Sequence, residues 1–136
     1  MAIYTPQKFE LNNLDGLSEK QIDVHLKLYE GYVKFINVLD EKQTELLKDS
    51  EKNAYALAEV TRRIGFEFNG MRMHEEYFSQ WEGGPAPIGG GLENALVQQY
   101  GSMDDWMARF KGVSMMRGTG WVNLSYYPKG LYQIPL

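Results

Sequence analysis

The sequence predicts an α+β fold in which a long antiparallel helical hairpin precedes a layer of short helices and a β-hairpin. Three observations favour this fold. Apolar residues recur at three- and four-residue spacing over two long segments, a Gly- and Pro-rich stretch follows, and the period then falls to two near the C-terminus. We therefore expect an extended N-terminal arm over 1–17, a helical hairpin domain over 18–82, a linker over 83–91 and a partial C-terminal α/β domain over 92–136.

Capping residues and apolar stripes predict the two long helices. Ser18 is a good N-cap, and Gln21, three residues later, completes a capping box. The first helix is expected to end near Lys48, and the second to follow "DSEKN" and end before Gly83 and Gly84. Two long helices with a short connection pack as an antiparallel hairpin. The stripes are Ile22, His25, Tyr29, Tyr32 and Ile36 in the first helix, and Val60, Ile64, Phe68, Met71, His74, Phe78 and Trp81 in the second.

The chain's two histidines, His25 and His74, both lie on these stripes. With a turn near residue 50, each histidine is about 36 Å from the turn at a rise of about 1.5 Å per residue. Both stripes must face the partner helix to bury their apolar side chains. We therefore expect the two imidazoles to lie level with each other across the helix interface.

Two short helices and a β-hairpin are predicted after the linker. "LENALVQQY" is typical of a helix ended by Gly101, and Ser102 with Asp105 starts a second helix in "SMDDWMARFKGVSMM". Segments 121–127 and 131–134 alternate as strands do, with a turn at 128–130. A two-stranded hairpin with a free edge is marginal in water. The domain is therefore expected to be incomplete, and whether Leu136 is the natural C-terminus stays open.

Composition narrows the class of protein. A net charge of −4 disfavours a nucleic-acid partner, because neutralising phosphates requires clustered Lys and Arg. No apolar run approaches the roughly 18 residues of a membrane span, so no membrane partner is expected. The absence of cysteine excludes disulfides and thiolate metal sites. "MAIYTPQKFE" does not look like a secretory signal, so we expect a cytoplasmic protein.

Four segments, "VHLKLYEGYV", "MHEEYF", "GSMDDWMARF" and "RGTGWVNL", resemble in order and separation those of the iron/manganese superoxide dismutase family. The resemblance covers nearly all of the chain from Ser18 onward. It implies a homodimer with one Mn or Fe ion per subunit, bound by three His, one Asp and a solvent molecule. The family's metal alternates between +3 and +2 and converts superoxide to oxygen and hydrogen peroxide.

The resemblance assigns roles to individual residues by position. His25 and His74 would be the first two metal ligands. Tyr32 would be the catalytic gateway tyrosine, which hydrogen-bonds near the substrate channel. Trp121 would line the wall of the pocket. Imidazole and carboxylate ligands suit iron or manganese.

The sequence also departs from the family pattern. The family's Asp and third His lie in an Asp-x-Trp-Glu-His segment, and this chain stops before it, so further ligands would be needed. His25 and Tyr32 are seven residues apart rather than the common eight, which rotates the rest of the helix by about 100° unless a bulge absorbs it. Tyr29 stands where much of the family has a His beside the ligands. Gly70 stands where iron enzymes often have Gln, which favours manganese or mixed metal use.

Two other interpretations stay open. The chain is alternatively a catalytically inactive structural or assembly subunit with the superoxide dismutase fold, or, less favoured, a helical bundle that binds haem through both histidines. A carboxylate-bridged di-metal site at Glu75 and Glu76 is excluded, because such sites need Glu three residues before each ligand His, and Met71 and Ile22 stand there.

Overall fold

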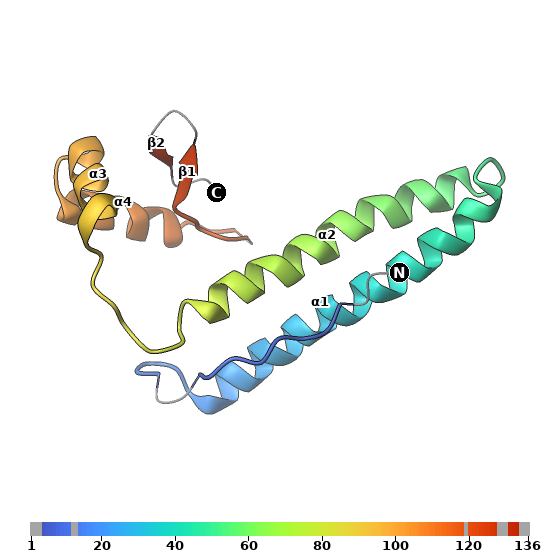
Figure 1. Ribbon diagram of the computed structural model, residues 1–136, viewed down its shortest axis with the longest axis horizontal. Helices are drawn as coiled ribbons and strands as arrows, with labels where there is room; N and C mark the ends of the chain where they lie inside the picture. The colour runs from blue at the N-terminus through green and yellow to red at the C-terminus, as the bar shows by residue number, and fades with distance from the viewer. Residues whose placement is uncertain (1–3, 12–13, 119, 128–130, 134–136) are drawn as a thin grey trace. The chain divides into compact units, whose positions relative to one another are not determined.

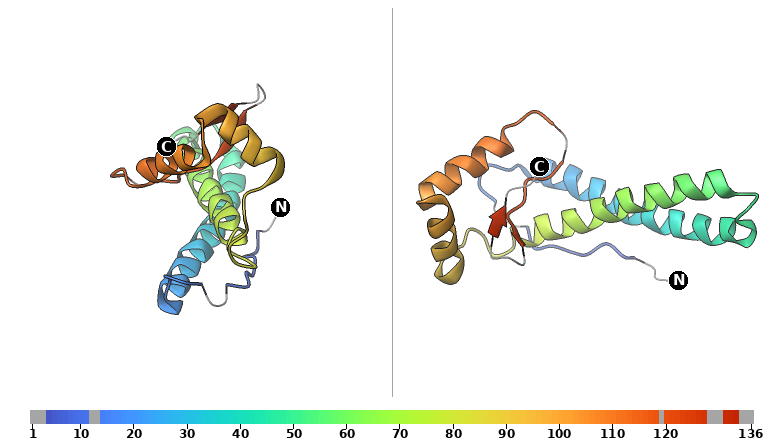
Figure 2. Two further views of the ribbon diagram at one scale, coloured as in Figure 1. Left: turned by 90° about the vertical axis from the view of Figure 1, so that its left-hand side faces the viewer. Right: turned by 90° about the horizontal axis from the view of Figure 1, so that it is seen from above.

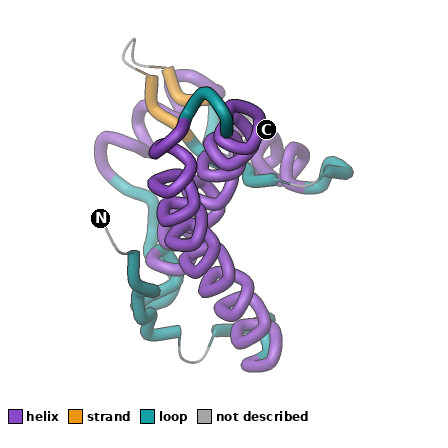
Figure 3. Tube along the Cα trace, turned by 90° about the vertical axis from the view of Figure 1, so that its right-hand side faces the viewer, coloured by secondary structure: helices purple, strands orange, loops and turns teal. Residues whose placement is uncertain are grey.

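The computed structural model describes residues 4–11, 14–118, 120–127 and 131–133, and it divides into two compact units, Met1–Pro85 and Ala86–Leu136. Most of the described chain is helical (Figure 3), and the predicted α+β class is confirmed. The elements in chain order (Figure 1) are α1 (Glu19–Leu46), the 3-10 helix η1 (Leu47–Asp49), α2 (Ala54–Ser79), α3 (Gly90–Tyr100), α4 (Met103–Ser114), β1 (Ser125–Tyr127) and β2 (Leu131–Gln133).

The first helix begins at the predicted capping box. The backbone N–H of Gln21 donates to Ser18 Oγ at 3.2 Å, and the backbone N–H of Ser18 donates to Gln21 Oε1 at 3.0 Å. These bonds satisfy two N–H groups that have no partner within the helix itself. The α-helix ends at Leu46, two residues before the predicted end, and η1 leads the chain into the turn.

The two long helices form the predicted antiparallel hairpin, and they run side by side in Figures 1 and 2. Side chains close the connection between them. Asn53 Nδ2 donates to the carbonyl of Leu46 at 3.1 Å, and the backbone N–H of Lys52 donates to Asp49 Oδ1 at 3.1 Å. The short connection fixes which residues of α1 and α2 lie opposite each other.

Residues 4–11 of the N-terminal arm run along the hairpin in an extended conformation (Figure 1). The side chain of Asn37 on α1 bonds both backbone polar groups of Tyr4. Asn37 Oδ1 accepts from the Tyr4 N–H at 2.9 Å, and Asn37 Nδ2 donates to the Tyr4 carbonyl at 2.8 Å. Further along, the backbone N–H of Gln7 donates to the Tyr29 hydroxyl at 2.9 Å, and the ring of Phe9 packs on that of Tyr29. The arm is therefore anchored at several points rather than only adjacent to the helices.

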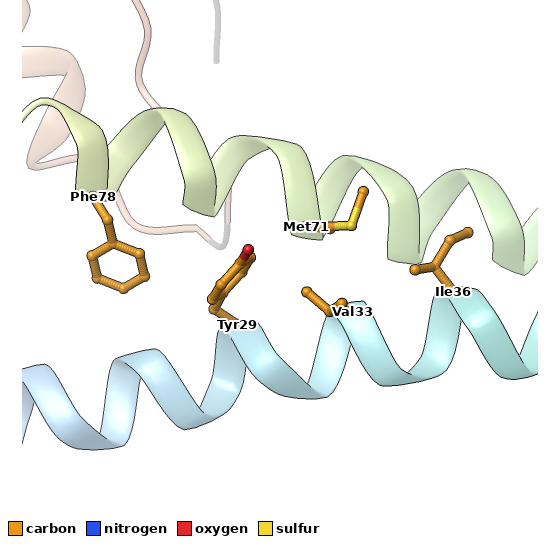
Figure 4. Close-up of a cluster of buried hydrophobic side chains, with 5 residues drawn as sticks. All are labelled: Tyr29, Val33, Ile36, Met71 and Phe78. Carbon is orange, nitrogen blue, oxygen red and sulfur yellow. The ribbon is translucent and has the colours of Figure 1, made fainter. Parts of the chain in front are cut away.

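The hydrophobic core of the first unit lies between the two long helices. Figure 4 shows the buried side chains of α1 facing those of α2. Apolar residues of the arm, Tyr4, Phe9 and Leu11, cover this cluster. Burying such side chains is the main stabilising term for a two-helix unit. The buried cluster consists of Tyr29, Val33 and Ile36 from α1 and Met71 and Phe78 from α2.

In the second unit, α3 and α4 bury Leu96 and Trp106. Gly101 adopts a φ of +95° after α3, and its N–H donates to the carbonyl of Val97 at 2.9 Å, so it ends the helix as predicted. Ser102 caps α4, and its Oγ accepts the backbone N–H of Asp105 at 3.0 Å. β1 and β2 pair in antiparallel register.

Two predicted boundaries in this unit are wrong. The expected strand over 121–127 is regular only from Ser125, and Ser125–Tyr127 are the residues whose pairing with β2 is described. α3 begins at Gly90, inside the predicted linker 83–91. The predicted turn at 128–130 and the end of the second strand at Ile134 lie outside the described residues.

Among the residues described, no helix is both long and apolar enough to cross a membrane.

Candidate metal centre

The two histidines meet across the hairpin. The ring centroids of His25 on α1 and His74 on α2 are 4.9 Å apart, and their planes lie at 84°. His74 is only 3% exposed, whereas His25 is half-buried. The rings are level across the interface, as their similar distances from the turn led us to expect.

A hydrogen bond to its own helix orients His74. Its Nδ1 lies 2.6 Å from the carbonyl oxygen of Gly70. A carbonyl only accepts, so Nδ1 must carry the proton and Nε2 must carry the lone pair in the neutral ring. This is the arrangement found in metal-binding histidines, where a hydrogen bond at one nitrogen fixes the tautomer and the other nitrogen binds the ion.

The surroundings keep both imidazoles neutral. Burial lowers the pKa of His25, and the neighbouring His74 lowers it further. Burial also lowers the pKa of His74, although the hydrogen bond to the Gly70 carbonyl opposes this by favouring the protonated ring. A neutral imidazole is the form that binds a metal ion.

Aromatic rings enclose the histidine pair. Tyr29 stacks on His74 at 6.4 Å and 27°, and the Tyr32 ring lies 5.1 Å from His74. On the other side, Phe78 and Tyr77 lie 5.0 Å and 5.2 Å from His25. These rings restrict water around the imidazoles and limit their rotation.

A surface pocket gives access to His25. It has a volume of about 560 Å³ and lies at the start of α1. A small ligand therefore has a route to the half-buried His25 ring. The pocket is lined by Ser18, Lys20, Gln21, Val24, His25 and Leu28.

The donors present fit part of a metal site. Imidazole nitrogen is a suitable ligand for iron. Within the described ranges, no three His, Asp or Glu side chains lie close enough together to hold an ion. His25 and His74 thus fit as two members of a larger ligand set. They do not fit a bis-histidine haem, because their rings are in direct contact and a porphyrin plane would have to lie between them.

Three curated proteins match the chain, although no family model matches it. A protein of Cupriavidus metallidurans named iron superoxide dismutase is 33% identical over 91% of this chain and 64% of its own length. Proteins of the same name from Saccharolobus solfataricus and Sulfolobus acidocaldarius are each 32% identical, over 89% and 81% of this chain. The chain is a relative of the iron/manganese superoxide dismutase family.

The chain matches only part of the length of each relative. The chain spans 64%, 61% and 55% of the lengths of these three iron superoxide dismutases. The matches to the first two relatives cover 91% and 89% of this chain, which leaves too few unmatched residues to exclude either histidine.

Tyr32 keeps its place beside the histidines despite the seven-residue spacing. α1 is continuous from Glu19 to Leu46, so no bulge absorbs a missing residue. Seven residues make nearly two full turns of an α-helix, which returns Tyr32 to the face of His25. The shorter spacing therefore does not remove Tyr32 from the histidine pair, and its gateway role stays a prediction.

Tyr32 also lies against Gly70. A Cβ on Gly70 would be 2.8 Å from Cγ of Tyr32 and closer still to Cδ1 and Cε1, so the ring occupies the space of a side chain there. At the position where much of the dismutase family has His, Tyr29 is 1% exposed and contacts His74. Trp121 belongs to the second unit, where it is half-buried, and its pocket role stays a prediction.

The sequence did not predict the contacts made by Glu75 and by the arm. Glu75 is buried, and its Oε1 accepts from the Tyr29 hydroxyl at 3.1 Å while Oε2 pairs with Arg72. The three-residue spacing from Arg72 to Glu75 was a usable signal for an ion pair on one helix face. The contact of Gln7 with Tyr29 had no comparable signal, because it joins residues 22 positions apart without periodicity.

Proposed function

We propose that this chain contributes to a superoxide dismutase centre, with His25 and His74 as two ligands of a single iron or manganese ion per subunit. One observation carries the proposal: the only two histidines of the chain are in ring contact, and the inner one has its tautomer fixed by Gly70. The names of the three relatives support the same activity. The remaining ligands would come from outside the described residues.

The bound ion would supply the redox chemistry, in which two superoxide ions and two protons become one oxygen molecule and one hydrogen peroxide molecule. The chain's own residues prepare the site for it. The hydrogen bond from Nδ1 to Gly70 directs the lone pair of His74 Nε2 to the ligand position. Tyr29, Tyr32 and Phe78 restrict water there. The hydroxyl of Tyr32 would hydrogen-bond and donate a proton at the substrate channel.

Gly70 and the relatives point to different metals. The resemblance associates Gly at this position with manganese or mixed use, whereas the relatives are named as iron enzymes. Since both metals accept imidazole and carboxylate ligands, the proposal includes either ion.

The test combines metal content with superoxide consumption. The purified protein, with the segment or partner that completes the ligand set, is loaded anaerobically with Fe²⁺ or Mn²⁺, desalted, and assayed for bound metal and for superoxide loss by stopped flow. We expect His25→Ala and His74→Ala each to reduce bound metal and activity at least about 10-fold, and Gln43→Ala on the exposed end of the hairpin to change neither. Unchanged metal content and activity in both histidine variants would refute the site.

The same experiment separates the inactive alternative. A structural or assembly subunit would bind no stoichiometric metal and consume no superoxide, yet fold normally by circular dichroism. The proposed homodimer is tested by light scattering, which should give twice the chain mass of 15.7 kDa.

A further inference from the structure

Glu75 is a buried carboxylate whose two oxygens already have partners. Its side chain is 7% exposed, Oε1 accepts from the Tyr29 hydroxyl at 3.1 Å, and Oε2 pairs with Nη1 of Arg72. A buried charge is tolerated only when it is paired and hydrogen-bonded in this way. With both oxygens engaged, Glu75 acts on its neighbours rather than as a metal ligand.

Tyr29 links this carboxylate to the arm and to His74. Its hydroxyl accepts the backbone N–H of Gln7 at 2.9 Å while donating to Glu75. Its ring is 1% exposed and stacks on His74 at 27°. The hydroxyl end of the ring is therefore fixed from two directions, and the ring limits the rotation of the imidazole.

The bond between Tyr29 and Glu75 also joins the two helices at the level of the histidines. Tyr29 lies one helical turn after His25 on α1, and Glu75 directly follows His74 on α2. A second side-chain hydrogen bond between these helices, from Gln43 to Thr61, is exposed and lies toward the turn. A slip of one helix along the other would break the Tyr29–Glu75 bond and separate the two imidazoles.

We propose that Tyr29 and Glu75 are positioning residues that hold His25 and His74 in register and hold the His74 ring in its orientation. Arg72 fixes Glu75, Glu75 fixes the Tyr29 hydroxyl, and the Tyr29 ring confines His74. The role in metal binding rests on the proposed function, whereas the positioning of the rings does not. Supporting groups of this kind typically change metal affinity about 10- to 100-fold when they are removed.

The test compares Tyr29→Phe and Glu75→Leu with the conservative Glu75→Gln, whose amide oxygen still accepts from Tyr29. Tyr55→Phe and Glu41→Leu are the matched controls, because Tyr55 is 96% exposed and Glu41 is exposed on α1, away from Arg72. Two readouts are used on the full chain: the imidazole ¹⁵N and ¹H resonances of both histidines without metal, and the affinity for Co²⁺ alone, followed by its absorbance. Circular dichroism checks that each variant folds.

We expect Tyr29→Phe and Glu75→Leu to shift the His74 resonances, weaken the nuclear Overhauser contact between the imidazoles, and reduce Co²⁺ affinity about 10-fold. Glu75→Gln should stay close to the unaltered chain in the His74 resonances, the nuclear Overhauser contact and the Co²⁺ affinity. Both control variants should match the unaltered chain as well. Folded Tyr29→Phe and Glu75→Leu variants with unchanged His74 resonances would overturn the positioning role, even if the Gln7 amide exchanged faster. Unchanged Co²⁺ affinity in His74→Ala would instead refute the metal centre, and the resonance shifts would still decide the positioning role.

Discussion

The ring of Tyr32 lies directly against Cα of Gly70, in the space where any other residue would carry its Cβ. Gly70 also supplies the carbonyl that orients His74. One glycine thus gives the gateway candidate its place on α1 and the ligand candidate its orientation on α2. Glycine weakens a helix interior by roughly 1 kcal/mol relative to alanine, and the room that it leaves for the Tyr32 ring explains why the position accepts that cost.

A methyl group at position 70 is predicted to destabilise the hairpin. Gly70→Ala should lower the free energy of unfolding by about 1–3 kcal/mol, because the Tyr32 ring must leave a low-energy packing position. The Tyr32 ring resonances should shift as well. Urea denaturation and NMR of the variant measure both effects.

Gly65 on the same helix provides the matched control for that substitution. A Cβ added there would meet nothing within 4 Å. Gly65→Ala should therefore raise the free energy of unfolding by about 0.4–1 kcal/mol through the lower entropy of the unfolded chain. A Gly70→Ala variant as stable as Gly65→Ala would contradict the close approach of Tyr32.

The histidine pair predicts a loss of stability on mild acidification. Both imidazoles have a pKa lowered below 6.5, so the unfolded chain binds protons more readily than the folded chain. Their contribution is complete above pH 6.5 and is lost as the pH falls through the lowered folded-state values. The urea midpoint of the metal-free chain should therefore be lower at pH 5.5 than at pH 7.5.

Removing both titrating rings is the control for this pH effect. A His25→Gln, His74→Gln double variant should show a flatter dependence of the urea midpoint between pH 5.5 and 7.5. If the double variant loses as much stability as the unaltered chain over this range, the effect arises from other groups.

Phe78 is predicted to be a major source of stability in the first unit. It is fully buried, contacts His25, and belongs to the core cluster. Phe78→Ala should lower the free energy of unfolding by about 3–5 kcal/mol through lost burial and a cavity. Phe35→Ala, at a residue 51% exposed on α1, should cost less than about 1 kcal/mol. Thermal and urea denaturation measure both variants. If Phe78→Ala and Phe35→Ala lost the same free energy of unfolding, the assigned core would be contradicted.

The long helices and the meeting of the histidines were predictable because both depend on local rules. The capping box at Ser18 and the apolar stripes specify where α1 begins and which face is buried. A short connection then fixes which residues of α2 lie opposite, so the approach of His25 to His74 follows from counting residues. Hydrophobic periodicity and helix geometry therefore predict the hairpin and the approach of the histidines without knowledge of tertiary contacts.

The polar network and the strand lengths depend on contacts that periodicity does not encode. The sequence excluded Glu75 from a di-metal site but gave it no other role, and only its distance from Tyr29 shows that it is a hydrogen-bond partner. The alternation in 121–127 predicted a longer strand than β1, whose described pairing with β2 covers Ser125–Tyr127. In both cases the deciding partner lies in another segment, which the local pattern of residues does not specify.

The anchoring of the arm by Asn37 is predicted to be required for its order. Asn37→Ala removes both hydrogen bonds to the Tyr4 backbone and the bond to the Val33 carbonyl. We expect the free energy of unfolding to fall by about 1–3 kcal/mol, because partly buried backbone groups lose their partners. The Tyr4 amide should exchange with solvent at least about 10-fold faster. Asn69→Ala, at an exposed site on α2, is the control and should leave the exchange unchanged. If Tyr4 exchanges at the same rate in Asn37→Ala as in the unaltered chain, the aromatic contacts of Tyr4 and Phe9 hold the arm without the asparagine.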